Sequence, residues 1–140
     1  MLQNFNSMCG KRQAVILSKD KGEARFHRAF NKDKDPVRHY RIDGDVIKSQ
    51  NVNKCDFLLM NDGKKKVYFI ELKGKKFLDA LIQLDSTEQL LQKDLAGYEK
   101  NFRIIYRSNT HDIKSNDYKK FYLKHKGLVV AKTNGHEEDI

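Results

Sequence analysis

The feature that most constrains the fold of this 140-residue chain is a pair of apolar runs separated by a turn sequence. The runs cover residues 57–60 and 67–70, and Asn61-Asp62-Gly63 follows the first of them. Aliphatic, aromatic and β-branched residues favour strands, and Asp-Gly is a strong signal for a tight turn between antiparallel strands. The sequence therefore predicts a β-hairpin. Because both runs are apolar at every position, we expect the hairpin to lie in a sheet that is covered on both faces.

The pairing register of this hairpin brings two acids together. A turn centred after Gly63 places Asp56 directly opposite Glu71, at a Cβ separation of roughly 4.5–5.5 Å. A turn centred before Gly63 places Asp56 opposite Phe69, with Glu71 as the diagonal neighbour. Side chains alternate along a strand, so Glu71 and Lys73 point to the same side. Both registers therefore predict a cluster of two carboxylates and one ammonium group.

Such a cluster needs a counter-charge. Two ionised carboxylates about 5 Å apart repel by roughly 3 kcal/mol at an effective dielectric constant near 20, so a cation, a shared proton or a basic neighbour is required. Lys73 is one candidate and a divalent metal ion is the other. An ordinary solvated ion pair is the alternative, worth at most about 1 kcal/mol. We favour the metal site because Glu71 and Lys73 lie where an apolar strand leaves its core.

The order of strand, turn, strand carrying Glu71-Leu72-Lys73 and then helix resembles the PD-(D/E)XK phosphodiesterase superfamily, over roughly residues 40–100. This resemblance implies a restriction endonuclease-like core, with a central mixed β-sheet flanked by helices. It also implies that Asp56, Glu71 and the backbone carbonyl of Leu72 bind Mg²⁺ (or Mn²⁺), and that Lys73 orients or activates the attacking water. The proline that often precedes the first aspartate is replaced by Cys55.

The same resemblance implies two further site residues. Many relatives supply an acid from an earlier helix, and Glu23 is the favoured equivalent, with Asp43 and Asp45 as rivals. Some relatives carry a glutamine on the helix after the Glu-x-Lys strand, and Gln83 matches that position. Gln83 also fits an ordinary exposed place on the flank of a helix, so both interpretations stay open.

The rest of the chain predicts a single α/β domain over residues 1–140, with its core at about 13–132. Helices are predicted over residues 23–31, 76–96 and 116–125, and further strands over 13–17, 39–47, 102–106 and 127–132. The helix over 76–96 has the clearest apolar stripe, and Gly97 can end it. The polar segment 133–140 is predicted to be frayed.

Charge and composition bound the partners. The formal net charge of +9 favours a polyanion, and Lys75 and Lys76 are expected to contact phosphates beside the metal site. No apolar run approaches the ~20 residues that span a bilayer, and residues 1–10 lack a signal-peptide pattern, so we expect a cytoplasmic protein with no membrane partner. Cys9 and Cys55 are expected to be free thiols.

These features predict a Mg²⁺-dependent nuclease that hydrolyses phosphodiester bonds, with DNA as the favoured polymer. Small basic members of the superfamily include resolvases and nucleases of phage and mobile elements. Two alternatives remain: a catalytically inactive protein that binds nucleic acid, and a protein-interaction or immunity module on the same fold. Clustered carboxylates facing a polyanion favour the enzyme, because a binding protein does not need them. The sequence leaves open a homodimer, the strandedness of the substrate and any sequence specificity.

Overall fold

The computed structural model describes residues 1–73, 76–107 and 111–140, with Lys73 described by its backbone alone. These residues form two α-helices, eight strands and two short 3₁₀ helices. In chain order the elements are η1 (Leu2–Asn4), β1 (Val15–Ser18), β2 (Phe26–Phe30), β3 (Val37–Arg41), β4 (Phe57–Asn61), β5 (Lys66–Lys73), α1 (Phe77–Leu90), β6 (Glu99–Tyr106), η2 (His111–Lys114), α2 (Asn116–Lys124), β7 (Val129–Thr133) and β8 (Gly135–Asp139).

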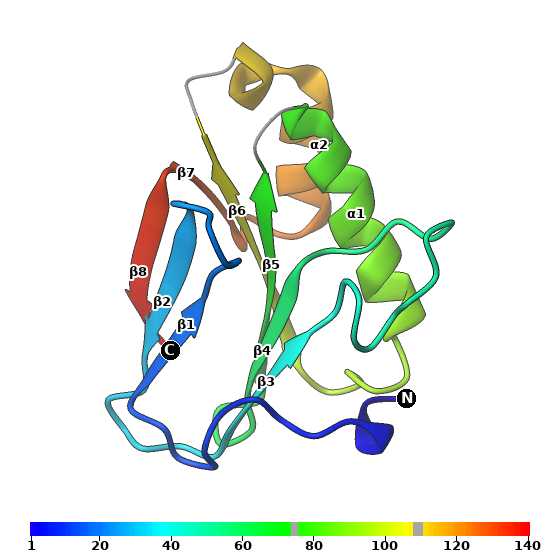
Figure 1. Ribbon diagram of the computed structural model, residues 1–140. Coiled ribbons are helices and arrows are strands. Elements are labelled where there is room, and N and C mark those ends of the chain that lie inside the picture. Colours follow the sequence, from blue (N-terminus) through cyan, green and yellow to red (C-terminus); the bar gives the residue numbers. More distant parts are fainter. Residues whose placement is uncertain (74–75, 108–110) are drawn as a thin grey trace.

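The strands form two sheets in a mixed α/β fold. The larger sheet has the order β3-β4-β5-β6-β7, in which the first two pairings are antiparallel and the last two are parallel. The smaller sheet has the order β1-β2-β8. Figure 1 shows α1 and α2 on one side of the larger sheet and the smaller sheet on the other. The larger sheet is therefore the middle layer of three.

Strand β4 shows how this middle layer is covered. All five of its residues are buried. Leu58 and Met60 belong to the core cluster shared with α1, whereas Phe57 and Leu59 belong to the cluster shared with β1 and β2. Burying a large apolar side chain stabilises a fold by about 1.5–3 kcal/mol. The side chains of β4 therefore stabilise the packing of the larger sheet against α1 on one face and against β1 and β2 on the other. The prediction of a hairpin covered on both faces is confirmed.

The hairpin register matches the first of the two predicted alternatives. Phe57 pairs with Ile70, and a four-residue loop, residues 62–65, connects the strands. The turn is thus centred after Gly63, and the register puts Asp56 opposite Glu71. A Cβ at Gly63 would lie only 2.7 Å from Asp35 Oδ1, so the loop needs glycine there.

Helix α1 begins close to the predicted position and ends earlier than predicted, at Leu90. Leu91 and Leu95 are nevertheless fully buried, because the turns that follow α1 continue along the core. Gly97 then adopts a φ of 84°, which favours glycine. The strands over 13–17, 102–106 and 127–132 and the helix over 116–125 are present with shifted ends, as β1, β6, β7 and α2. The strand over 39–47 is shorter and earlier, as β3.

The predicted helix over residues 23–31 is wrong, because residues 26–30 form strand β2. Phe26 and Phe30 are four residues apart, and that spacing puts two side chains on one face of a helix and also on one face of a strand. The strand is fixed by its neighbours, since β2 pairs with β1 on one edge and β8 on the other.

The predicted frayed tail is also wrong. Residues 135–139 form β8, which pairs in parallel with β2, and the side chain of Ile140 is buried. Glu138 accepts hydrogen bonds from Arg103 at 2.6 and 2.9 Å and lies 2.7 Å from His27 Nε2. The tail is therefore held by polar contacts from distant strands, which an apolar pattern cannot reveal.

The cysteines and the helices bear on two of the expectations, free thiols and no membrane partner. Cys9 and Cys55 are both free thiols, as predicted. Within the described residues, neither α-helix has the length and apolar character needed to cross a membrane.

Candidate functional site

Asp56 and Glu71 lie side by side at the end of the larger sheet where β4 starts. Glu71 is 3% exposed in β5, and its Oε1 accepts a hydrogen bond of 3.1 Å from the backbone N–H of Asp56. In return, Asp56 Oδ2 accepts a hydrogen bond of 2.8 Å from the backbone N–H of Leu72. Glu71 is therefore anchored by the backbone just before β4 and Asp56 by the backbone of β5, which fixes their mutual position.

The surroundings of Asp56 disfavour its negative charge. Burial raises the pKa of Asp56 to about 6, and the charges of Asp20 and Asp43 act in the same direction. The hydrogen bonds from Leu72 N–H and from the Glu71 side chain lower this pKa without offsetting the rise. The pair is thus an acidic cluster within a basic chain, and a cation would be stabilising there.

The residue that directly precedes Asp56 belongs to the core. Cys55 is fully buried, and its backbone N–H donates a 2.8 Å hydrogen bond to Thr87 Oγ1 on α1. Burial, together with the charge of Glu71, raises the pKa of the Cys55 thiol well above its ordinary value. Because a thiol is nucleophilic only as the thiolate, Cys55 is a packing residue and not a nucleophile.

Asp20 is an acid near the pair that the sequence did not indicate, and its charge raises the pKa of Asp56. It follows β1, and its carboxylate forms an ion pair with Arg41 at 2.6 Å. The Arg41 guanidinium also lies 4.6 Å from the centre of the Phe57 ring. Asp20 reaches the cluster from the smaller sheet, and nothing in the local spacing of the sequence marks it. The sequence of a hairpin predicts which of its own residues pair across the strands, but it does not predict which loop of another sheet lies beside them.

The favoured upstream acid and its rivals are found in different places. Glu23 is exposed in the loop before β2 and pairs with Arg25 at 2.9 Å, and the helix expected to carry it is absent. Asp45 is exposed as well. Asp43 is exposed and lies 3.7 Å from Lys54 Nζ, and it is the rival whose charge raises the pKa of Asp56.

The remaining predicted residues follow Glu71 along the chain. The backbone of Lys73 pairs with Tyr106, while its side chain and the whole of Lys75 lie outside the described residues. Lys76 is exposed and precedes α1 with a φ of 53°. Gln83 is half-buried on α1, and its backbone carbonyl oxygen accepts a 2.8 Å hydrogen bond from Thr87 Oγ1. Gln83 is therefore one helical turn before Thr87, whose hydroxyl accepts the hydrogen bond from Cys55 N–H.

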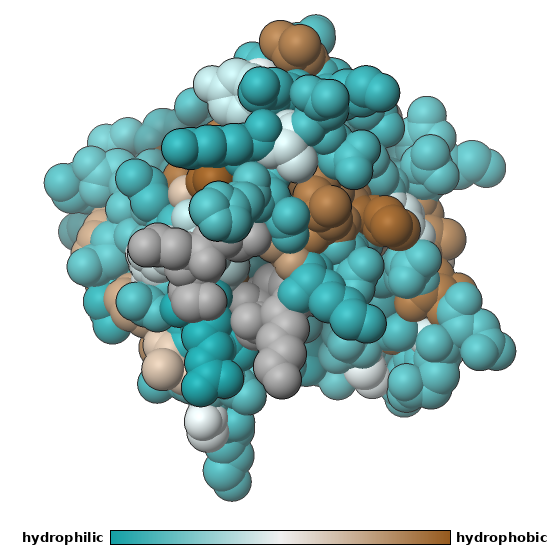
Figure 2. Space-filling model, turned by 90° about the horizontal axis from the view of Figure 1, so that it is seen from above, coloured by the Kyte–Doolittle hydropathy of each residue, from teal (hydrophilic) through white to brown (hydrophobic). Residues whose placement is uncertain are grey.

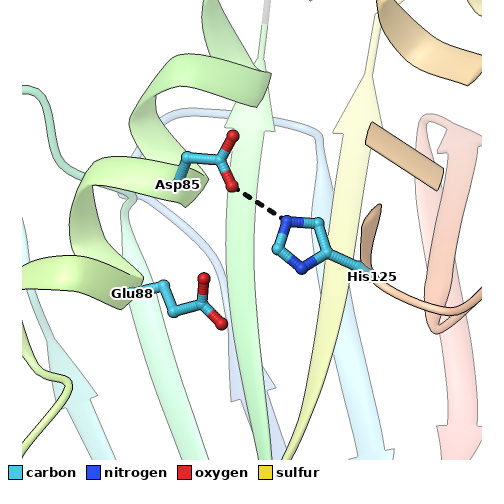
Figure 3. Close-up of side chains that lie close together, drawn as sticks. All are labelled: Asp85, Glu88 and His125. Carbon is cyan, nitrogen blue, oxygen red and sulfur yellow. Dashed lines mark hydrogen bonds and ion pairs between the residues drawn. The ribbon is translucent and has the colours of Figure 1, made fainter. Parts of the chain in front are cut away.

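A second group of possible metal ligands joins the two helices. Asp85 and Glu88 on α1 and His125 after α2 have ligand atoms within 4.8 Å of one another (Figure 3). Sequence reasoning missed this group because the histidine comes from a separate helix. The three-residue spacing of Asp85 and Glu88, which puts both on one helical face, is the only local signal.

Comparison of the chain with models of known protein families, with curated proteins and with solved structures finds no match. The geometry of the site is a pair of anchored carboxylates at neighbouring strand ends in a mixed α/β fold.

Proposed function

We propose that this protein is a metal-dependent nuclease of the PD-(D/E)XK type, which hydrolyses phosphodiester bonds in nucleic acid. The observation that carries the proposal is the pairing of Asp56 with Glu71, in which Glu71 accepts the N–H of Asp56 and Asp56 accepts the N–H of Leu72. A carboxylate pair of this kind binds hard divalent cations through oxygen. Glu71 also directly precedes Leu72 and Lys73, in the order that the resemblance requires.

The order of elements supports the same proposal. Antiparallel strands β4 and β5 are followed by α1, which leads to β6 in parallel with β5. The candidate acids lie where β5 ends and the chain turns towards α1. Ligand sites in α/β sheets commonly occupy the carboxyl ends of strands, so the proposed site has a suitable place in the fold.

The donor atoms fit Mg²⁺ or Mn²⁺. Asp56, Glu71 and the Leu72 carbonyl would hold the ion, and all three offer oxygen. When bound, such an ion lowers the pKa of water and offsets charge on a phosphodiester. Lys73 would then orient the attacking water. The charges of Asp20 and Asp43 also raise the pKa of Asp56, although each of these acids has a basic neighbour of its own, Arg41 and Lys54 respectively.

The surface around the site suits a charged substrate. Figure 2 views the molecule from the end at which β5 ends, and hydrophilic side chains dominate that face. With a net charge of +9, the chain should attract the nucleic-acid backbone at long range. Exposed Lys76 adds a positive charge close to the end of β5. We therefore assign nucleic acid as the substrate, with DNA as the first polymer to test.

The test is incubation of purified protein with plasmid, single-stranded DNA and RNA in Mg²⁺ or Mn²⁺, with and without EDTA. We expect cleavage of at least one polymer that EDTA stops. Absence of cleavage with every polymer and both metals would contradict the nuclease assignment. Salt-dependent binding without cleavage would instead support the catalytically inactive nucleic-acid-binding protein.

A further inference from the structure

The side chains of Asp85, Glu88 and His125 converge between α1 and α2. Asp85 and Glu88 are three residues apart and therefore share one face of α1. His125 directly follows α2, and its Nε2 lies 2.8 Å from Asp85 Oδ1. Figure 3 shows the carboxylate of Glu88 beside this pair, with both acids pointing from the helix towards the ring. Three ligand atoms from two helices lie within 4.8 Å of one another.

The imidazole of His125 is fixed by packing. Its ring centre is 4.0 Å from that of Phe102 and 4.5 Å from that of Phe121, and the side chain is only 6% exposed. The ring therefore has little freedom to turn away from Asp85. A ligand whose orientation is set before binding loses little entropy when a metal binds. His125 is in this sense preorganised, whereas the two acids can adjust.

Solvent reaches the cluster from both sides. A surface cavity of about 370 Å³ is lined in part by Asp85, and another of about 350 Å³ is lined in part by Glu88 and His125. Lys124 borders both cavities. An ion could enter from either side, and water could complete its coordination. The cluster is thus accessible although its histidine is buried.

We propose that Asp85, Glu88 and His125 form a binding site for one Zn²⁺ ion that links α1 to α2. Zinc bonds of about 2.0–2.2 Å to nitrogen and oxygen place the ligand atoms of one ion about 3.3 Å apart. His125 Nε2 and Asp85 Oδ1 are 2.8 Å apart and no pair of ligand atoms is more than 4.8 Å apart, so the observed separations lie on either side of this value or close to it. Imidazole favours Zn²⁺ over Mg²⁺ or Ca²⁺, which prefer an all-oxygen set. The site is therefore chemically distinct from the proposed nuclease site, and neither proposal depends on the other.

One cation already competes for this position. Lys124 Nζ lies 3.2 Å from Asp85 Oδ1, the same oxygen that faces His125. The Lys124 side chain is 55% exposed, so it can move into solvent when an ion binds. Removing its charge should consequently strengthen zinc binding. If Asp85 and His125 formed only an ion pair, removing the Lys124 charge would not strengthen zinc binding.

The test is calorimetric titration of chelator-treated protein with Zn²⁺. The background variant carries Asp56→Asn and Glu71→Gln, so that ions at the proposed nuclease site do not contribute. We expect one Zn²⁺ per chain and a higher melting temperature in its presence. Glu88→Gln should lower the affinity at least about tenfold. Asp79→Asn, an exposed acid in the first turn of α1, is the matched control and should leave the affinity unchanged.

Substitution of buried His125 could unfold the protein, so Glu88→Gln is the variant used for the test. The melting temperature of Glu88→Gln without zinc shows whether this variant is folded. A Lys124→Gln variant should bind Zn²⁺ severalfold more tightly. Equal affinities for Glu88→Gln and Asp79→Asn would overturn the proposal, as would the absence of one-to-one binding in the background variant. Weaker binding by Lys124→Gln would likewise overturn it.

Discussion

At the scale of single residues, the two central acids also serve as backbone acceptors. Because Glu71 Oε1 accepts the Asp56 N–H, Glu71→Ala would leave that donor without its partner, at a cost of about 1–3 kcal/mol. Glu71→Gln keeps an oxygen at this position and should retain most of the stability. We expect urea unfolding to separate the two variants by at least about 1 kcal/mol. Equal stabilities would show that the hydrogen bond contributes little.

Asp56 should make the stability of the metal-free protein depend on pH. Folding raises the pKa of Asp56 from an ordinary 3.8 to about 6, so the folded state favours the protonated acid. Its contribution to stability is full below pH 3.8 and is lost as pH rises through about 6. Asp56→Asn cannot ionise and should lose less stability than the parent between pH 4 and pH 8. Urea unfolding in EDTA measures this difference, and parallel pH profiles would contradict it.

Lys73 should affect turnover more than metal binding. If its ammonium group orients the attacking water, Lys73→Ala should lower the single-turnover rate by about 10²–10⁴-fold. Lys73→Arg should restore little, because a guanidinium differs in shape and keeps its proton. Metal affinity, measured by calorimetry, should change little in either variant. Full activity of Lys73→Arg would mean that the residue supplies positive charge alone.

The hairpin acids were predictable from the sequence, whereas other site residues were not. Asp56 and Glu71 belong to one hairpin, so the turn and the alternation of side chains were enough to pair them. Asp20 and His125 reach their clusters from other sheets and helices, and their positions depend on contacts between distant segments. Glu23 was favoured because of a helix that does not form.

At the scale of elements, β8 depends on the ion pair between Glu138 and Arg103. Arg103 is buried and Glu138 is half-buried, so removing the acid leaves the Arg103 charge uncompensated, at a cost of up to about 3–5 kcal/mol. We expect Glu138→Gln to destabilise the protein by an amount near that range. The control is Glu137→Gln, whose pair with Arg28 is exposed and contributes at most about 1 kcal/mol. Hydrogen exchange in β8 and β2 locates the loss, and similar effects of both variants would contradict this account.

The same glutamate should resist acid. Burial alone would raise the pKa of Glu138, but hydrogen bonds from His27 and Arg103 hold it at about 2, below an ordinary 4.5. Its contribution to stability is therefore full above pH 4.5 and is lost as pH falls through about 2. The parent should lose more stability than Glu138→Gln between pH 5 and pH 2. Equal losses in urea unfolding would argue that the pair is already broken near neutral pH.

The helices and strands that were predicted correctly are those with a clear local sequence pattern. The hairpin was found because two continuous apolar runs flank a turn signal, and α1 was found because its apolar residues recur at helical spacing. Strand β2 was mistaken for a helix because Phe26 and Phe30 fit both periods. Strand β8 is polar, and its partners are β2 and Arg103, which are far away in sequence.

At the scale of the whole molecule, the positive charge should make nucleic-acid binding depend on salt. Log affinity for duplex DNA should fall linearly with log salt, by about 0.9 for each phosphate contact. Lys75→Ala with Lys76→Gly should flatten this slope by up to about two units. Glycine is chosen at position 76 because the backbone of Lys76 has a positive φ, which glycine adopts readily. Lys93→Ala, beyond the far end of α1, is the control. An unchanged slope in the double variant would place the phosphate contacts elsewhere.

The rate of Mg²⁺-dependent DNA cleavage by the parent, Glu71→Gln and Glu99→Gln tests directly whether the carboxylate pair is catalytic. Glu99 is an exposed acid in β6, so its substitution changes the net charge equally without touching the carboxylate pair. Unfolding curves first confirm that all three proteins are folded. We expect cleavage by the parent and by Glu99→Gln, and none by Glu71→Gln. Undiminished cleavage by folded Glu71→Gln would contradict this expectation.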